Sequence, residues 1–142
     1  MNFGDNIRAN TNEIVAELNV TGRVFDPDAL TRGTQLHPTK KWLAGDLIGR
    51  SSRRYEHNGW SIATPKRSEV EDALDELLST LEEHWDELLG ATREQQVELS
   101  IVVYARSFVP GIQIRADQLR RFAELNASID VDLYDLAREN DG

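Results

Sequence analysis

The fold is decided by residues 68–90, which read SEVEDALDELLSTLEEHWDELLG. Apolar side chains recur in this stretch every three or four residues, at Val70, Leu74, Leu77, Leu81, Trp85 and Leu88. That spacing predicts one long amphipathic α-helix with these side chains on its buried face. Ser68 and Glu71 match a capping box at the start of the helix, and Gly90 suits its C-terminal end.

The remaining surface of this helix is acidic. It carries nine carboxylates and no lysine or arginine, which equals the formal net charge of -9. The nine acids are Glu69, Glu71, Asp72, Asp75, Glu76, Glu82, Glu83, Asp86 and Glu87. Such a helix predicts an acidic surface for a basic protein partner, because charge complementarity speeds association and selects the partner.

A basic segment comes just before the acidic helix. Residues 32–67 contain eight lysines and arginines against two acids, a balance of +6. Two interpretations stay open: the segment pairs with the acidic helix inside the molecule, or it forms a partner-binding surface of its own. The pI near 4.8 means that phosphate repulsion opposes binding over most of the surface, so nucleic acid is not an expected partner.

The composition indicates one soluble domain. The chain has 142 residues, of which 39% are hydrophobic, enough to build a core without disulfides. It has no cysteine, which excludes disulfide frameworks, thiolate zinc sites and cysteine nucleophiles. No apolar run resembles a signal peptide or a membrane span, so we expect a cytoplasmic protein. A single α+β domain is expected over residues 1–142, with residues 1–12 as a flexible arm and residues 137–142 as a frayed tail.

Alternating apolar residues predict the strands of a sheet. These strands are expected at residues 14–20, 59–63, 97–103, 112–114 and 129–133. Pro110 and Gly111 mark a turn, so the strand after them is expected to run antiparallel to the strand before them.

Two shorter helices are expected as well. Asp26 and Pro27 favour the start of a short helix, which Gly33 interrupts. Asp117 opens another helix, and Asn126 can take the left-handed position at its end. The residues expected to point inward from this helix are Leu119, Phe122, Ala123 and Leu125. Together these elements predict an α+β fold with a mainly antiparallel sheet and helices on one face, a two-layer sandwich and ferredoxin-like relative.

Several short motifs occur in a familiar order. They are Phe25-Asp26-Pro27, Leu36-His37-Pro38-Thr39, Trp42, Gly45-Asp46 and Gly59-Trp60-Ser61, followed by a Pro-Gly turn and a final strand reading Ile129-Asp130-Val131-Asp132-Leu133-Tyr134. In this order and spacing the chain resembles the bacterial family catalogued as domain of unknown function 4279, roughly over residues 14–136. The resemblance implies an α+β domain and brings no established activity, substrate or catalytic residues.

The last predicted strand carries the first candidate site. Asp130 and Asp132, two residues apart on a strand, point to the same side with Tyr134 in the same row. Two carboxylates about 7 Å apart could share a hard cation such as magnesium. The alternative is a solvated or salt-bridged strand face, on which polar residues are ordinary.

A second candidate group contains two tryptophans. Trp42 and Trp60, near the corner made by Gly45 and Asp46, could wall a ligand pocket. The alternative places Trp60 in the core with Trp42 closing the sandwich over it, and makes Asp46 a turn or capping residue.

The long irregular stretch at residues 36–57 is the third candidate, since such loops are often functional or mobile. Its Arg53 and Arg54 could draw in a phosphorylated ligand, or could lie exposed and pair with the acids of the molecule. The three histidines show no metal-ligand spacing, and no Gly-x-Ser-x-Gly elbow or phosphate-binding glycine loop occurs. We therefore predict no metal site, no cofactor and no catalytic residue.

Three functions remain, in this order. The first is a non-enzymatic protein-interaction module, of which a toxin-neutralising immunity protein is one form, with its partner on the acidic helix over residues 68–89. The second is a small-molecule-binding regulatory domain, with a homodimer through the sheet as an option. The third is a divalent-metal enzyme that uses Asp130 and Asp132.

Overall fold

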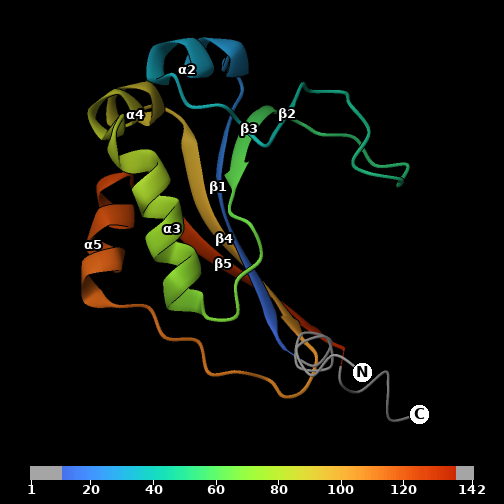
Figure 1. The fold of residues 1–142 in the computed structure, drawn as a ribbon. Helices are drawn as coiled ribbons and strands as arrows, with labels where there is room; N and C mark the ends of the chain where they lie inside the picture. Colours follow the sequence, from blue (N-terminus) through green and yellow to red (C-terminus); the bar gives the residue numbers. More distant parts are fainter. Residues whose placement is uncertain (1–10, 137–142) are drawn as a thin grey trace.

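The computed structural model describes residues 11–136 as five strands and four helices (Figure 1). The expected arm and frayed tail lie outside these residues, apart from residues 11 and 12. Asn12 is buried, and its Oδ1 accepts a hydrogen bond of 2.8 Å from the Arg106 backbone N–H. Among residues 11–136, no helix has the length and apolar character needed to cross a membrane.

One mixed sheet forms the first layer of the fold. Its strand order is β2-β3-β1-β4-β5, with β1 (Glu13–Gly22) antiparallel to both β3 (Asn58–Ala63) and β4 (Gln96–Ala105). The outer strand β2 (Lys40–Trp42) pairs antiparallel with β3, and β5 (Ser128–Asp135) pairs parallel with β4. Because β1 lies between β3 and β4, the chain from β3 through the helices to β4 makes a split β-α-β unit.

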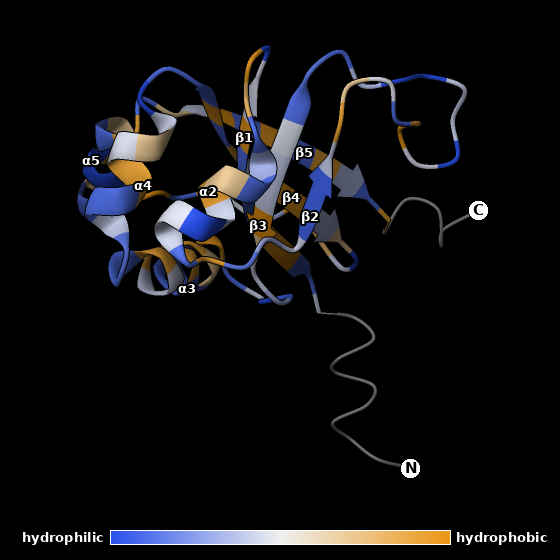
Figure 2. Cartoon of the chain, turned by 90° about the horizontal axis from the view of Figure 1, so that it is seen from above, coloured by the Kyte–Doolittle hydropathy of each residue, from blue (hydrophilic) through white to orange (hydrophobic). Residues whose placement is uncertain are grey.

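Helices cover one face of this sheet and form the second layer (Figure 2). The alternation predicted for β1 is present, since Ile14, Ala16, Leu18 and Val20 are buried while the residues between them face the other way. They pack beneath α3 (Val70–Glu82), whose Leu74, Leu77 and Leu81 are also buried. The two-layer α+β architecture expected from the pattern is confirmed.

The prediction of one continuous helix over residues 68–90 is wrong. The helix ends at Glu82 and a second one, α4 (Trp85–Thr92), starts after a turn at residues 83 and 84. No glycine or proline marks this break. It lets α4 turn across the end of the sheet and pack beside α2 (Pro27–Thr34), as Figure 1 shows. The apolar stripe survives, because Trp85 and Leu88 stay buried.

The start of α3 also differs from the prediction. Its N-cap is Glu69, whose side chain makes no capping hydrogen bond, so the expected capping box at Ser68 and Glu71 does not form. The preceding Arg67 is tied instead to β1, where its backbone N–H and carbonyl bond to Ile14 at 2.9 and 2.6 Å. The start of α2 agrees with the prediction, since Asp26 Oδ1 accepts from the Asp28 backbone N–H at 3.0 Å.

The strand expected at residues 112–114 is absent. The chain instead runs without helix or strand from β4 to α5 (Ala116–Glu124), and β5 then returns parallel to β4. Leu119 and Ala123 point to solvent, contrary to prediction, while Phe122 and Leu125 are buried. The reason is that α5 leans on α3, and the position facing α3 is held by Gln118, which is 0% exposed.

The irregular stretch at residues 36–57 contains a strand that the sequence did not predict. After β2, residues 43–57 project from the sheet, and we call this segment the projecting arm (Figure 1). The projecting arm is hydrogen-bonded to itself, with Tyr55 N–H donating to the Asp46 carbonyl at 2.9 Å and Ile48 N–H to the Arg53 carbonyl at 2.8 Å.

Candidate functional site

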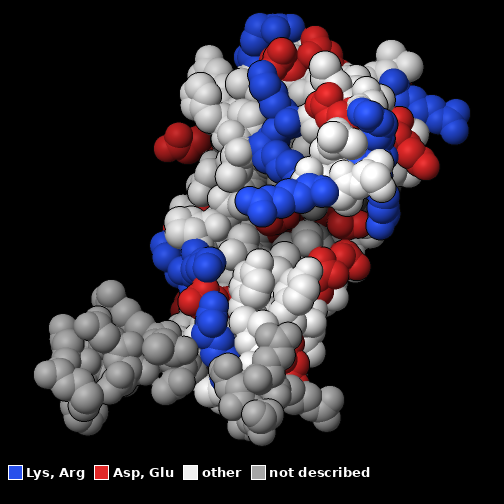
Figure 3. Space-filling model, turned by 90° about the vertical axis from the view of Figure 1, so that its right-hand side faces the viewer, with Lys and Arg blue, Asp and Glu red and all other residues white. Residues whose placement is uncertain are grey.

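No helix within residues 11–136 covers the face of the sheet opposite α3, α4 and α5, and we call it the open face (Figure 3). Because side chains alternate along a strand, the polar positions between the core residues all point here. The positions of β1, β4 and β5 at its centre are Glu17, Asn19, Glu98, Ser100, Asp130 and Asp132.

Four carboxylates gather around Ser100 on the open face. Across the strands Ser100 lies opposite Glu17 on one side and Asp130 on the other. Glu98 and Asp132 occupy positions two residues away along their strands, so neighbouring carboxylates are about 7–10 Å apart at their Cβ atoms. None of the four forms an ion pair with another described residue.

Two of these carboxylates have raised pKa values. Burial disfavours the charged form of Glu17 and raises its pKa; Lys40 opposes this effect and Asp132 adds to it. Burial also raises the pKa of Glu98, and the negative charges of Asp130 and Asp132 raise it further. The group of four is therefore a patch of negative charge in which Glu17 and Glu98 are partly desolvated, and we call it the carboxylate patch.

An aromatic wall borders the open face on the β2 side. The rings of Trp42 and Tyr55 stack with centroids 4.8 Å apart. Lys40 Nζ lies 5.2 and 5.4 Å from the two ring centroids and donates to the Tyr55 hydroxyl at 2.7 Å. Trp42 can lie against the sheet because Gly59 has no side chain at the paired position.

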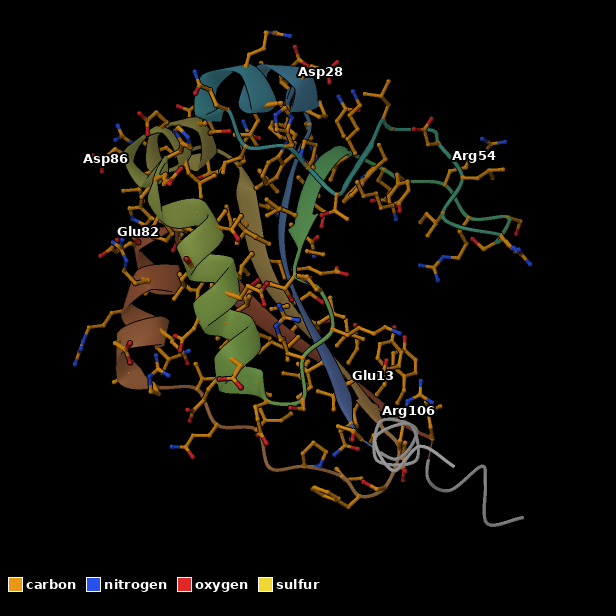
Figure 4. The ribbon with its side chains drawn as sticks, viewed as in Figure 1. Glu13, Asp28, Arg54, Glu82, Asp86 and Arg106 are labelled. Carbon is orange, nitrogen blue, oxygen red and sulfur yellow. The ribbon has the colours of Figure 1, made fainter. Side chains whose placement is uncertain are left out.

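A similar cluster lies at the other end of the face. Tyr104 and Tyr134 stack with centroids 5.4 Å apart, and Lys66 Nζ lies 5.6 Å from the centroid of Tyr104. The same Nζ is 2.8 Å from Glu13 Oε2, and Arg106 lies on the other oxygen at 3.4 Å. Glu13 and Arg106 are neighbours near the end of the sheet in Figure 4. The hydrogen bond from Lys66 is the main cause that lowers the pKa of Glu13.

Between the aromatic wall and the carboxylate patch the surface forms a groove of about 490 Å³. Its lining includes Glu17, Asn19, Lys40, Trp42 and Glu98. This volume is within the range of small-ligand sites, which is roughly 300–1,000 Å³. The groove therefore combines an aromatic surface, the Lys40 cation and three carboxylates, those of Glu17, Glu56 and Glu98.

The two tryptophans do not wall one pocket, contrary to that candidate reading. Trp60 is 0% exposed in the core beneath the helices, and its Nε1–H donates to Thr31 Oγ1 at 3.1 Å. Trp42 lies on the opposite face, beside the groove. Asp46 closes a turn by accepting from the Leu43 backbone N–H at 2.8 Å, which is the alternative role considered for it.

Asp130, Asp132 and Tyr134 share one side of β5, as their alternation predicted. They are not near the arginines of the loop. Arg54 lies on the projecting arm (Figure 4), beyond β2, whereas β5 is the opposite edge of the sheet. Arg54 donates to the Gly45 carbonyl at 2.7 Å, and neither it nor Arg53 pairs with a carboxylate among residues 11–136.

No group of three His, Asp or Glu side chains within residues 11–136 is placed to hold a metal ion. The carboxylate patch is spread across three strands, and its members point outward from one face of the sheet. The patch therefore suits several separate cationic groups better than one metal ion.

The acids of α3 and α4 divide into two groups. Four of the nine are paired internally: Glu71 and Asp75 with Arg115, Glu76 with Arg67, and Glu82 with Arg121. The other five, Glu69, Asp72, Glu83, Asp86 and Glu87, form no ion pair in the described part of the chain. The helical surface thus has about half of the free charge that the sequence suggests, and most of the pairing comes from α5.

Sequence reasoning missed Glu17, Glu98, Lys40 and Tyr55 as site residues. Glu17 and Glu98 stand at the polar positions of two predicted strands, and this alternation is the signal that could have found them. Their meeting depends on the β1–β4 register, which sets Glu17 opposite Ser100 and Glu98 opposite Asn19. The sequence pattern predicts faces, and pairing decides which residues share one.

Comparison with known families gives one result. The family described as Domain of unknown function (DUF4279) matches the chain over residues 12–136. No curated protein and no solved structure matches the chain.

Proposed function

Since the chain belongs to this family of unknown function, which assigns it no activity, we propose from its geometry that the protein is a non-enzymatic interaction module that binds a basic protein partner on the open face. One observation carries this proposal. In the carboxylate patch Glu17 and Glu98 are partly desolvated on the open face, and no cation of the described chain pairs with the patch.

The electrostatics favour a cationic partner. A carboxylate whose pKa is raised by burial and by neighbouring acids is destabilised in its charged form. A lysine or arginine side chain brought to Glu17 or Glu98 relieves that destabilisation, so binding gains free energy that the free protein lacks. Neutralisation of a basic toxin by an immunity protein is one biological form of such binding, because complementary charge raises the association rate.

The unpaired acids of α3 and α4 offer a second surface for a basic partner. Asp86 lies at the outer side of α4 in Figure 4. These helices and the open face are on opposite sides of the sheet, so one compact partner surface cannot cover both. Variants on the two surfaces therefore separate the two modes of binding.

The test uses a partner identified by crosslinking in the native host and then purified. Glu17→Lys combined with Glu98→Lys should weaken the complex by tenfold or more, about the effect of losing a close charge pair, and should reduce its salt dependence. Asp72→Lys combined with Glu83→Lys is the matched control on the helical side of the molecule, one residue on α3 and one in the turn after it, with the same change of net charge. Weakening by this control pair alone would contradict the open face as the binding surface.

A small ligand in the groove is the second candidate function, favoured by the aromatic wall beside Lys40. A flat ring with an anionic group would stack on Trp42 or Tyr55 and meet the Lys40 cation. A metabolite screen should then change tryptophan fluorescence in the native protein, and this change should be lost in Trp42→Phe. A ligand response that persists in Trp42→Phe would contradict this site.

A further inference from the structure

The strand β5 is a free edge of the sheet. It pairs with β4 on one side, and no described strand lies on its other side. From Ser128 to Tyr134 one row of backbone N–H and C=O groups therefore points outward from the sheet. Such an edge is a template for another strand.

Apolar side chains line the helix side of this edge. Ile129, Val131 and Leu133 are 41%, 41% and 46% exposed, although their partners on β4 are fully buried. The reason is that α5 packs against α3 and leaves β5 uncovered. The segment before α5 adds the exposed side chains of Phe108, Val109 and Ile112 to the molecule's apolar surface. A contiguous apolar strip on a strand edge is the pattern of an interaction site.

The open-face side of the same edge is acidic. Asp130 and Asp132 alternate with the apolar residues, so each face of β5 has one chemical character. A strand that pairs with β5 must place apolar residues on the helix side. On the open-face side, basic residues would lie directly opposite the aspartates, where opposite charges stabilise a cross-strand pair.

A second copy of the chain does not meet this requirement. A two-fold dimer pairs β5 antiparallel with itself, and residues that face each other must lie on the same side of the sheet. Centred on Val131, the pairing sets Asp130 against Asp132 twice. Centred on Asp132, it sets that residue against itself. Registers centred on Ile129 or Leu133 avoid this contact but pair fewer residues of β5. Like charges directly opposite destabilise a strand pair, so the aspartates oppose the registers that pair most of the strand with a second copy.

We propose that β5 accepts an extended strand from a partner protein, and that this strand alternates apolar and basic residues. Backbone hydrogen bonds supply affinity, the strip at Ile129, Val131 and Leu133 takes the apolar side chains, and Asp130 and Asp132 take the basic ones. The inference rests on the proposed function in one respect, the basic character of the partner, and adds the mode of docking.

The test uses a short synthetic peptide in which lysine and valine alternate, and a control in which glutamate replaces lysine. Amide hydrogen exchange of the full chain is followed with each peptide. The lysine peptide should slow exchange at the β5 amides that point away from β4. The other edge strand, β2, is an internal control, because Lys40 and Lys41 repel the same peptide. No protection of β5, or equal protection by both peptides, would overturn the proposal.

Charge reversal adds a second arm. Asp130→Lys combined with Asp132→Lys should weaken lysine-peptide binding by about tenfold and create binding of the glutamate peptide. Asp72→Lys combined with Glu83→Lys, which changes the net charge equally, should do neither. In sedimentation, the native protein should not pair through β5, whereas Asp130→Asn combined with Asp132→Asn should self-associate. Native dimers that disappear in Val131→Lys would overturn the proposal in favour of a second copy.

The two proposals fail differently. If the lysine peptide binds and Glu17→Lys with Glu98→Lys abolishes that binding, but β5 amides stay unprotected, the edge proposal fails and the open face stands. If β5 is protected while this Glu17 and Glu98 pair leaves the native partner's affinity unchanged, the open face fails and the edge stands.

Discussion

The indole of Trp42 lies so close to the backbone of Gly59 that a Cβ atom at residue 59 would come within 2.0 Å of two ring carbons. The two residues are cross-strand partners on β2 and β3. A glycine at this position is therefore what allows the indole to lie on the open face and stack with Tyr55. The aromatic side of the groove therefore depends on residue 59 being a glycine, which has no Cβ atom.

Gly59→Ala should displace Trp42 and destabilise the protein by about 1–2 kcal/mol, the usual cost of overpacking. Urea unfolding measures the loss, and the shape of the groove changes with it. Adding Gly59→Ala to Trp42→Ala should cost much less, because the clash is gone. Gly90→Ala is the control: a Cβ there meets no atom within 4 Å, and alanine should stabilise α4 by about 0.5–1 kcal/mol.

Gln118 should behave as a buried structural residue. Its side-chain amide donates to the Glu71 carbonyl at 3.1 Å and to Asp75 Oδ1 at 3.0 Å, and its oxygen accepts from the Arg115 backbone N–H at 3.1 Å. Gln118→Leu leaves the Arg115 backbone N–H without its partner and removes one hydrogen bond each from the Glu71 carbonyl and Asp75, so it should lower the free energy of unfolding by about 2 kcal/mol, measured by urea titration. Leu119→Gln, at an exposed neighbouring position, should stay within about 0.5 kcal/mol of the native protein. Equal effects of the two changes would refute the buried role.

Arg121 joins α5 to both α3 and α4. Its guanidinium lies 4.3 Å from the ring centroid of Trp85 and pairs with Glu82 and Glu124, while Trp85 Nε1–H donates to Glu124 at 2.8 Å. Lysine cannot stack and make two forked contacts at once, so Arg121→Lys should cost about 1 kcal/mol. Thermal unfolding and the fluorescence of Trp85 report the change. Arg120→Lys, on the exposed side of α5, should be neutral, and a loss of the same size there would contradict the assignment.

Acid should weaken the contact between α3 and α5. Hydrogen bonds from Arg115 and then Gln118 lower the pKa of Asp75 in the folded protein. A carboxyl whose folded pKa is below its unfolded pKa contributes stability above the unfolded value, and this contribution is lost as the pH falls through the folded value. Asp75→Asn should therefore destabilise the protein at neutral pH and make the loss of stability below about pH 4 less steep. If urea titrations show that Asp75→Asn loses stability below about pH 4 as steeply as the native protein does, this account is contradicted.

Ionisation of Glu17 should change the stability of the protein in the opposite direction to ionisation of Asp75. Its folded pKa is raised, chiefly by burial, so the folded state binds more protons than the unfolded state between the two pKa values. The ionised side chain therefore destabilises the protein above its folded pKa, and acidification through that pKa relieves the penalty. Glu17→Gln should raise the free energy of unfolding at neutral pH and have a smaller effect in acid. Destabilisation by Glu17→Gln at neutral pH would show that the carboxylate has a stabilising partner.

The local elements and their apolar faces follow from the order of residues along the chain. The alternation of Ile14 to Val20 and the period of Val70 to Leu88 each encode which side of an element is apolar, and burial of that side is the dominant driving force. The helix start at Asp26 was also predictable, because capping is a contact within a few residues.

Where those faces meet and where the elements stop depends on long-range packing. The break before Trp85 has no local signal, since it follows from packing against α2 and from the bond to Glu124. The absent strand at residues 112–114 and the exposed side of β5 depend on where α5 rests. The carboxylate patch and the groove exist because strand register places Glu17, Glu98 and Asp130 together. Those contacts join residues far apart in the chain, and no local pattern encodes them.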